Sequence, residues 1–203
     1  APAVRALWRM RPSRELDIVA NPPDVGRQML SYYGVRTIAL RDGELGAERL
    51  QQALQAIEQV LPGARPVYHR DGVSIYDVGQ VRQPQPFLVL RAGWLDVEGK
   101  GPDVGRWMGE SAALTLVNPA PAARLVRLAL DVTSYQRARP LTLRIDGHLV
   151  GTFVVPPSAH TIRLAFALPA GEHRLDLVSP TDQEAVAPGR ALSILVTRVA
   201  VTP

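Results

Sequence analysis

Three aromatic side chains in the second half of the chain, Trp94, Trp107 and Tyr135, have the residue types to bind a sugar. Aromatic faces pack against the apolar C–H faces of sugar rings, and the nearby Arg91 and Asp96 could hydrogen-bond to hydroxyl groups. The same rings could instead belong to the hydrophobic core, because large aromatic residues are on average well buried. The sequence therefore leaves two interpretations, a carbohydrate platform and core packing, of which packing is the commoner.

No catalytic nucleophile is indicated. The segment 109–113 (GESAA) lacks the second glycine of a nucleophile elbow and precedes a predicted strand. The chain has no cysteine, which excludes disulfides, thiolate zinc sites and cysteine nucleophiles. We therefore predict no catalytic residue and no cofactor.

A metal site is not predicted either. The four histidines, His69, His148, His160 and His173, fall on separate segments without ligand spacing. The loop 96–103 (DVEGKGPD) contains three carboxylates that could bind calcium, but Lys100 opposes a cation there. Turns at the surface explain these residues without a metal.

The small net charge argues against nucleic acid as a partner. The net charge is only +4, and basic residues exceed acidic ones by a similar small margin in each half of the chain. Nucleic acid binding requires a concentrated positive field, so nucleic acid is not an expected partner.

The first part of the chain predicts a small α/β domain, residues 1–82. Leu16–Ala20 and 35–40 have the pattern of strands, 25–33 and 44–61 have helical spacing, and 66–78 predicts a hairpin turning at Asp71-Gly72. The first two strands should be parallel and joined by a right-handed crossover. The intervening turn, Asn21-Pro22-Pro23-Asp24, lacks the glycines of a phosphate-binding loop, so nucleotide binding is not expected.

The second part, residues 83–203, predicts a β-sandwich of the jelly-roll type. Polar, proline-containing residues 80–86 read as the linker before it. About eight strand-length segments follow, separated by turn signals such as Asp146-Gly147. These segments are 87–95, 112–117, 125–132, 141–145, 149–155, 161–168, 173–178 and 192–201.

Several motifs give the chain a similarity to a known family. They are 32–40 (YYGVRTIAL), 106–109 (RWMG), 116–119 (LVNP), 143–147 (LRIDG) and 169–175 (PAGEHRL). The first resembles the helix-to-strand element, and the others the terminal β-sandwich, of the soluble C-terminal portions of bacterial polytopic membrane proteins of the GT-C glycosyltransferase-like class. The similarity covers most of the chain.

The resemblance implies a non-catalytic extracytoplasmic domain. In that class the membrane-embedded part holds the catalytic carboxylate and the polyprenyl-phosphate sugar donor. The expected partners are therefore the membrane-embedded portion of the same full-length protein and a glycan. The implied role is recognition of a glycan acceptor or structural support, with attachment to the cell membrane in the full-length protein.

The alternative function is that of an enzyme. A free-standing secreted glycoside hydrolase would need a pair of carboxylates, and Asp42 and Glu44 flank a glycine in a surface loop of the first domain.

Overall fold

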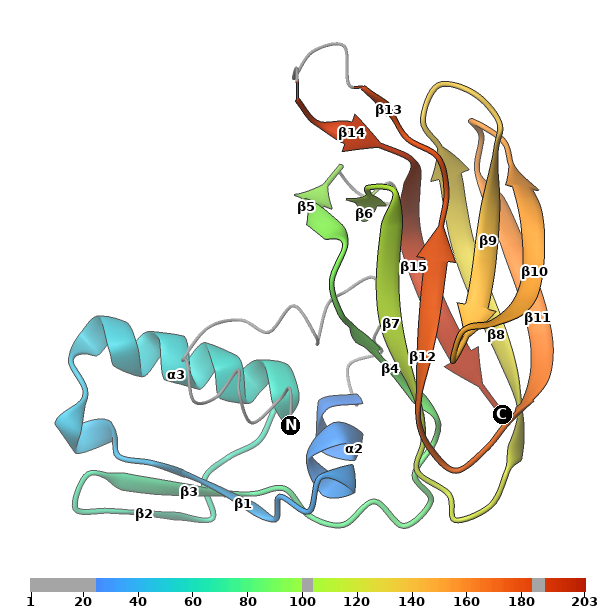
Figure 1. The fold of residues 1–203 in the computed structure, drawn as a ribbon. Helices are drawn as coiled ribbons and strands as arrows, with labels where there is room; N and C mark the ends of the chain where they lie inside the picture. The colour runs from blue at the N-terminus through green and yellow to red at the C-terminus, as the bar shows by residue number, and fades with distance from the viewer. Residues whose placement is uncertain (1–24, 100–103, 184–188) are drawn as a thin grey trace. The chain divides into compact units, whose positions relative to one another are not determined.

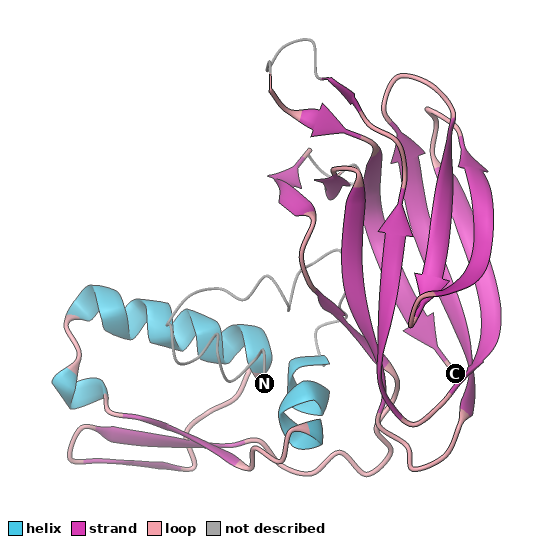
Figure 2. Cartoon of the chain, in the orientation of Figure 1, coloured by secondary structure: helices cyan, strands magenta, loops and turns pink. Residues whose placement is uncertain are grey.

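The computed structural model describes residues 25–99, 104–183 and 189–203. The described residues up to Gln85 and those from Pro86 onward form two compact units, which are described separately. Strands predominate among the described residues, as Figure 2 shows, and the described helices lie in the first unit. Among the described residues, no helix has the length and hydrophobicity that a membrane span requires.

The first unit combines helices with a small sheet. In chain order its elements are α2 (Val25–Tyr32), β1 (Thr37–Leu40), the 3-10 helix η2 (Asp42–Glu44), α3 (Ala47–Val60), β2 (Tyr68–Arg70) and β3 (Val73–Asp77). The described sheet has the order β1-β3-β2 and both of its pairings are antiparallel. Figure 1 shows α3 running along this sheet. The predicted parallel partner of β1, Leu16–Ala20, lies outside the described residues.

Two local predictions in this unit are confirmed. The hairpin turns at Asp71 and Gly72, whose φ angles of 52° and 71° are those of a type I′ turn. Helix α2 is followed by Gly34 with φ of 74°, and the amide of Val35 donates to the Leu30 carbonyl at 2.9 Å. This is the glycine-terminated helix end expected from the sequence.

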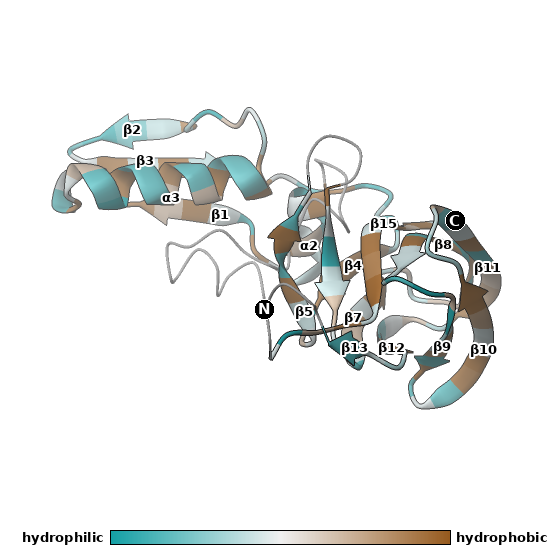
Figure 3. Cartoon of the chain, turned by 90° about the horizontal axis from the view of Figure 1, so that it is seen from above, coloured by the Kyte–Doolittle hydropathy of each residue, from teal (hydrophilic) through white to brown (hydrophobic). Residues whose placement is uncertain are grey.

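The helical spacing of α3 predicts an apolar stripe of Leu50, Leu54, Ile57 and Leu61, and the structure confirms only part of it. Ile57 and Leu61 are buried, and Leu50 is partly exposed. Leu54 is 42% exposed, whereas the small residues Ala53 and Ala56 are buried with Ile57 and Val60. Both sets have helical spacing, so periodicity alone did not distinguish them. Figure 3 shows hydrophilic and hydrophobic residues alternating along this helix.

The predicted linker is attached to α2. It contains no helix or strand, but Arg27 Nη1 donates to the Val78 carbonyl at 2.7 Å. The Gln85 amide also donates to Gln28 Oε1 at 2.7 Å. The first contact lies two residues before the segment and the second is made by its penultimate residue, so α2 holds the chain near both ends of the segment.

The second unit is a sandwich of two five-stranded antiparallel sheets, which agrees with the predicted β-sandwich. One sheet, here called the β7 sheet, has the order β10-β9-β12-β7-β4, and the other, the β8 sheet, has the order β11-β8-β15-β6-β5. The strands are β4 (Phe87–Leu90), β5 (Trp94–Glu98), β6 (Gly105–Met108), β7 (Ser111–Asn118), β8 (Arg124–Ser134), β9 (Arg139–Ile145), β10 (His148–Val155), β11 (His160–Leu168), β12 (Gly171–Val178) and β15 (Ile194–Thr202), with a short pair β13 (Asp182–Gln183) and β14 (Ala191–Leu192) beside them.

Alternation along the strands builds the core. In β8, Val126, Leu128, Leu130 and Val132 are buried and alternate with partly or fully exposed residues. They pack with inward-facing residues of the other sheet, such as Leu114, in one hydrophobic cluster.

A glycine corrects the prediction of one strand over 87–95. The segment forms β4 in the β7 sheet and β5 in the β8 sheet, because the chain turns between them at Gly93, where φ is 91°. A Cβ at Gly93 would lie 2.1 Å from the Ser111 carbonyl oxygen. Only glycine combines this backbone conformation with this approach.

We predict that Gly93→Ala lowers the free energy of unfolding by at least about 2 kcal/mol, from backbone strain and the clash with Ser111. Urea denaturation of the full chain measures the change. The matched control is Gly147→Ala, since Gly147 also has a positive φ of 82° but nothing within 4 Å of an added Cβ. This control should cost roughly 1 kcal/mol. Equal losses for the two variants would contradict the close-approach argument.

Candidate functional site

Trp94 belongs to the hydrophobic core, so it is not part of the carbohydrate platform that the sequence suggested. Its side chain packs in the hydrophobic cluster of the sandwich with 7% exposure. The indole Nε1 donates to the Ala113 carbonyl at 2.9 Å, which satisfies its only polar group. Gly93 turns the chain immediately before this residue, so the break between β4 and β5 determines its inward position.

The structure brings Trp107 and Tyr135 together. Both are partly exposed, their ring centroids are 5.6 Å apart, and their planes are nearly perpendicular at 89°. This edge-to-face arrangement is a favourable geometry for aromatic pairs. Trp107 comes from β6 and Tyr135 from the turn that directly follows β8, so residues 28 positions apart in sequence form one surface feature.

The aromatic pair lies on the outer face of the β8 sheet. Trp107 is the register partner of Leu195, which in turn pairs with Thr133. The residues that precede and follow Trp107, Leu195 and Thr133 in sequence are all buried. Since side chains alternate between the faces of a strand, Trp107, Leu195 and Thr133 form a row that faces away from the core.

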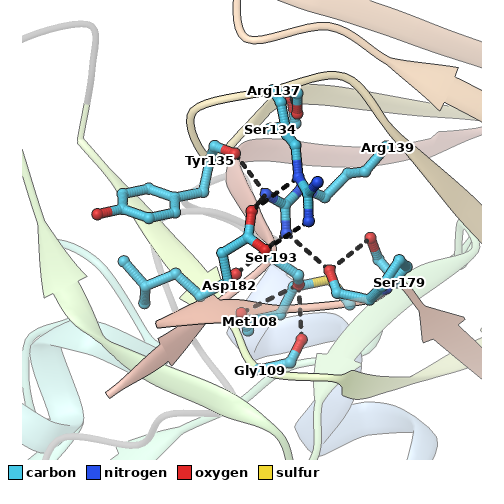
Figure 4. Close-up of polar contacts among 11 residues, drawn as sticks. Met108, Gly109, Ser134, Tyr135, Arg137, Arg139, Ser179, Asp182 and Ser193 are labelled. Carbon is cyan, nitrogen blue, oxygen red and sulfur yellow. Dashed lines mark hydrogen bonds and ion pairs between the residues drawn. The ribbon is translucent and has the colours of Figure 1, made fainter. Parts of the chain in front are cut away.

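Ser193 fixes the two aromatic segments relative to each other. This residue is fully buried. Its carbonyl accepts the Tyr135 amide at 2.9 Å, and its own amide donates to the Met108 carbonyl at 3.0 Å. Its hydroxyl donates to the Gly109 carbonyl at 2.6 Å. Ser193 therefore acts as a positioning residue between the segment that carries Trp107 and the one that carries Tyr135 (Figure 4).

Arg139 forms hydrogen bonds with the turn that contains Tyr135 from its buried side. Its side chain is 4% exposed. One terminal nitrogen donates to the carbonyls of Pro180 at 2.7 Å and Leu192 at 3.2 Å, and the other donates to the Tyr135 carbonyl and to Asp182 Oδ2. Figure 4 shows this guanidinium surrounded by its acceptors. A planar fork is needed to reach so many groups at once, which favours arginine over lysine.

A second arginine completes the ion pair. Arg137 donates to both oxygens of Asp182, at 2.7 Å from Nη2 and 3.0 Å from Nε. Hydrogen bonding from Arg137 is the main cause that lowers the pKa of Asp182, with Arg139 adding to it against partial burial of the carboxylate. The charged form of Asp182 is therefore favoured, and it ties the strand β13 to the Tyr135 turn.

Two arginines close to the aromatic residues in sequence, Arg106 and Arg91, have hydrogen-bonding partners of their own. Arg106 is 6% exposed, and its Nη1 donates to the Leu95 carbonyl at 2.6 Å. Arg91 Nε donates to Thr115 Oγ1 at 2.7 Å in the β7 sheet. Neither side chain is available to a ligand on the outer face of the β8 sheet.

The carboxylates of the alternative hydrolase site have separate partners. Asp42 Oδ2 accepts the hydroxyl of the buried Ser74 at 2.6 Å, and His69 Nδ1 lies 2.9 Å from the same hydroxyl. Glu44 instead pairs with Arg41 at 3.2 Å. Because the Ser74 proton is directed to a carboxylate rather than to the imidazole, this group is not arranged as a nucleophile with its base.

Histidines and acids do not converge on a metal position. Within the described ranges, no group of three or more His, Asp or Glu residues is placed to hold a metal ion. His173 Nδ1 lies 2.7 Å from Asp146 Oδ2, and this hydrogen bond is the main cause that lowers the pKa of Asp146. His173 therefore joins the β9–β10 turn to β12 and is not simply solvated. In the loop 96–103, for which no calcium site is predicted, Glu98 pairs with Arg190, and Asp103 lies outside the described residues.

Comparisons with known proteins give only a distant likeness. No protein-family model and no curated protein matches the chain. Among solved structures, a family 35 carbohydrate binding module from an environmental isolate is 21% identical, with 58% of this chain and 96% of that chain covered and a TM-score of 0.36. The CBM36-1 domain of a multidomain xylanase from the hindgut metagenome of Trinervitermes trinervoides is 15% identical, with 58% and 97% covered and a TM-score of 0.40.

A CBM36 module solved with calcium and xylotriose is 13% identical, with 53% of this chain and 93% of that chain covered and a TM-score of 0.37. Identities and scores this low do not assign a ligand to this chain.

We predict that Arg137→Gln raises the pKa of Asp182, because the main hydrogen-bonding partner of the carboxylate is lost. The lowered folded pKa means that this interaction stabilises the fold above the ordinary Asp pKa of about 3.9 and is lost as the pH falls through the folded value. The stability difference between the two proteins should therefore be largest above about pH 4 and should vanish in stronger acid.

Carboxyl NMR of Asp182 and urea denaturation across this pH range measure both effects. Arg174→Gln is the control, since Arg174 pairs with Asp176 on β12, away from Asp182. An unchanged Asp182 titration in Arg137→Gln would contradict the proposed cause.

Proposed function

We propose that the sandwich is a non-catalytic carbohydrate-recognition domain that contacts sugar through Trp107 and Tyr135. The observation that carries the proposal is the perpendicular, partly exposed aromatic pair on the outer face of the β8 sheet. Sugar rings have apolar C–H faces that pack against aromatic rings. A corner made of two rings offers a face and an edge to one sugar unit.

The rigidity of the pair supports this role. Ser193 connects both aromatic segments through backbone hydrogen bonds, and Arg139 binds the carbonyl of Tyr135. Binding to side chains that already hold their positions loses less conformational entropy than binding to mobile ones. Shallow sites of this kind bind weakly, with dissociation constants in roughly the micromolar to millimolar range.

Glycoside hydrolysis has less support. A hydrolase needs two carboxylates that act on the same glycosidic bond, whereas Asp42 binds Ser74 and Glu44 binds Arg41. We assign neither residue a catalytic role.

The resemblance to GT-C glycosyltransferase-like proteins leads to a second part of the proposal, that the chain is an extracytoplasmic portion of such a membrane protein. There the sandwich would recognise the glycan acceptor while the membrane-embedded portion holds the sugar donor. The reading frame of the full-length protein tests this part. Several transmembrane segments in the same reading frame would support it, and a frame without any would refute it.

We predict that Trp107→Ala weakens glycan binding by about tenfold or more and that Tyr135→Ala has an effect of the same direction. The measurement is calorimetric titration of the full chain against a panel of soluble oligosaccharides and affinity electrophoresis in polysaccharide gels. Tyr68→Ala is the matched control, because Tyr68 is an aromatic residue of the first unit with 46% exposure.

The proposal would be refuted by either of two results. One is a wild-type chain that binds no member of the panel. The other is a Trp107→Ala variant that keeps wild-type affinity while its thermal unfolding matches that of the parent.

A further inference from the structure

The outer face of the β8 sheet continues from the aromatic pair as a series of rows across β15, β8 and β11. Register pairing defines three of these rows below Trp107 and Leu195. They are Arg198, Asp131 and Thr161, then Ala200, Ala129 and Arg163, then Thr202, Arg127 and Ala165. Successive rows are about 7 Å apart, so the face extends roughly 20 Å from the Trp107 row to the Arg127 row.

Small residues hollow this face into a groove. Ala129, Ala165 and Ala200 form its floor, and Arg127, Arg163 and Arg198 rise beside them. The groove is shallow and open, with a volume of about 390 Å³. Arg163 is the cross-strand partner of Ala129, and Arg127 is that of Ala165, so these two guanidinium groups stand opposite methyl groups. Arg198 is instead the cross-strand partner of an acid, Asp131.

The groove has an unbalanced positive charge. Arg163 and Arg198 are exposed and have neither an ion pair nor a side-chain hydrogen bond within the described part of the chain. Arg127 donates only to the backbone oxygen of Pro203, at 2.9 Å. The single acid of these rows, Asp131, accepts the Thr161 hydroxyl at 2.7 Å. The three arginines and this one acid leave a local excess of two positive charges, and an anionic ligand would meet the unpaired donors of Arg163 and Arg198.

We infer that this groove binds the carboxylates of an acidic polysaccharide, a chain that contains uronic acid units. The inference rests on the proposed carbohydrate recognition by Trp107 and Tyr135, and it specifies the class of glycan. A guanidinium group matches a carboxylate with two parallel hydrogen bonds. The aromatic pair then holds one sugar unit while Arg198 and Arg163 pair with carboxylates further along the chain.

The shape of the site favours an extended polymer. The rows of the outer face follow one another along the strands from the Trp107 row to the Arg127 row, so an extended chain could lie along them. The alanine floor leaves room for a sugar ring between the arginine stems, whose methylene groups add apolar contact. A nucleic acid is not favoured, because the excess of two positive charges in these rows is local and the net charge of the whole chain is only +4.

The test compares two ligands with the same backbone, polygalacturonate and its fully methyl-esterified form, in which the carboxylates are neutral. The full chain should bind polygalacturonate about tenfold more tightly than the ester at low salt. This preference should diminish as salt is raised, because exposed charges are screened.

Variants separate the groove from the aromatic pair. Arg163→Gln/Arg198→Gln should abolish the preference for polygalacturonate and leave binding of the ester unchanged. The control Arg144→Gln/Arg174→Gln removes the same charge from exposed positions on the other sheet and should retain the preference. Trp107→Ala should weaken binding of both ligands.

Each contrary outcome has a distinct meaning. Equal affinity for polygalacturonate and its ester would overturn the inference and leave the proposed carbohydrate recognition intact. No binding of either ligand would also overturn the inference, and the oligosaccharide panel then decides separately whether the proposed carbohydrate recognition holds. An unchanged preference in Arg163→Gln/Arg198→Gln would also overturn the inference. Binding of dextran sulfate as tight as that of polygalacturonate, with neither affinity changed by Trp107→Ala, would overturn the inference as well. That pattern is the one expected of a surface that binds any polyanion.

Discussion

The arrangement of the candidate site depends on the hydrogen bonds that the buried guanidinium group of Arg139 donates. Removing a charge from water costs several kcal/mol unless its donors are paired. Here three backbone carbonyls and Asp182 supply the acceptors for the terminal nitrogens, while Arg139 Nε has no partner among the described residues. The carbonyls come from the Tyr135 turn and from segments more than 40 positions away, so one side chain joins the Tyr135 turn to the β13–β14 strand pair.

Hydrophobic packing and polar contacts determine different features of this sandwich. The aliphatic core determines that two sheets face each other, but it is non-directional and would tolerate small shifts of the turns at their ends. Hydrogen bonds are directional, and those of Ser193 and Arg139 specify where the Tyr135 turn lies relative to β6. The aromatic pair is therefore held by polar groups beneath it. Below the pair, the strand ladder itself spaces the arginines, since each row is fixed by register.

Much of the sandwich is predictable because its signals are local. Alternating residues marked most of its strands, and the Asp146-Gly147 pair marked a turn whose residues do have positive φ angles, as Asp71-Gly72 did in the first unit. The candidate site was only partly predictable. Trp94 and Trp107 look alike in sequence, yet the turn at Gly93 directs one into the core while β6 presents the other outside. No sequence pattern pointed to Ser193, Arg139 or Asp182, because their roles arise from contacts between residues that are distant in the chain.

The third arginine of the groove shows how far a single irregularity can alter a surface. Strict alternation in β15 from Val196, which is fully buried, would direct Arg198 toward the core and Val199 outward. A bulge between Val196 and Arg198 adds one residue, so that Val199 is buried with 3% exposure and Arg198 faces solvent opposite Asp131. The extra residue, Thr197, donates its hydroxyl to the Asp131 carbonyl at 3.3 Å. The bulge thus preserves the core on both sides of it and places a third guanidinium on the outer face, between the aromatic pair and Arg163.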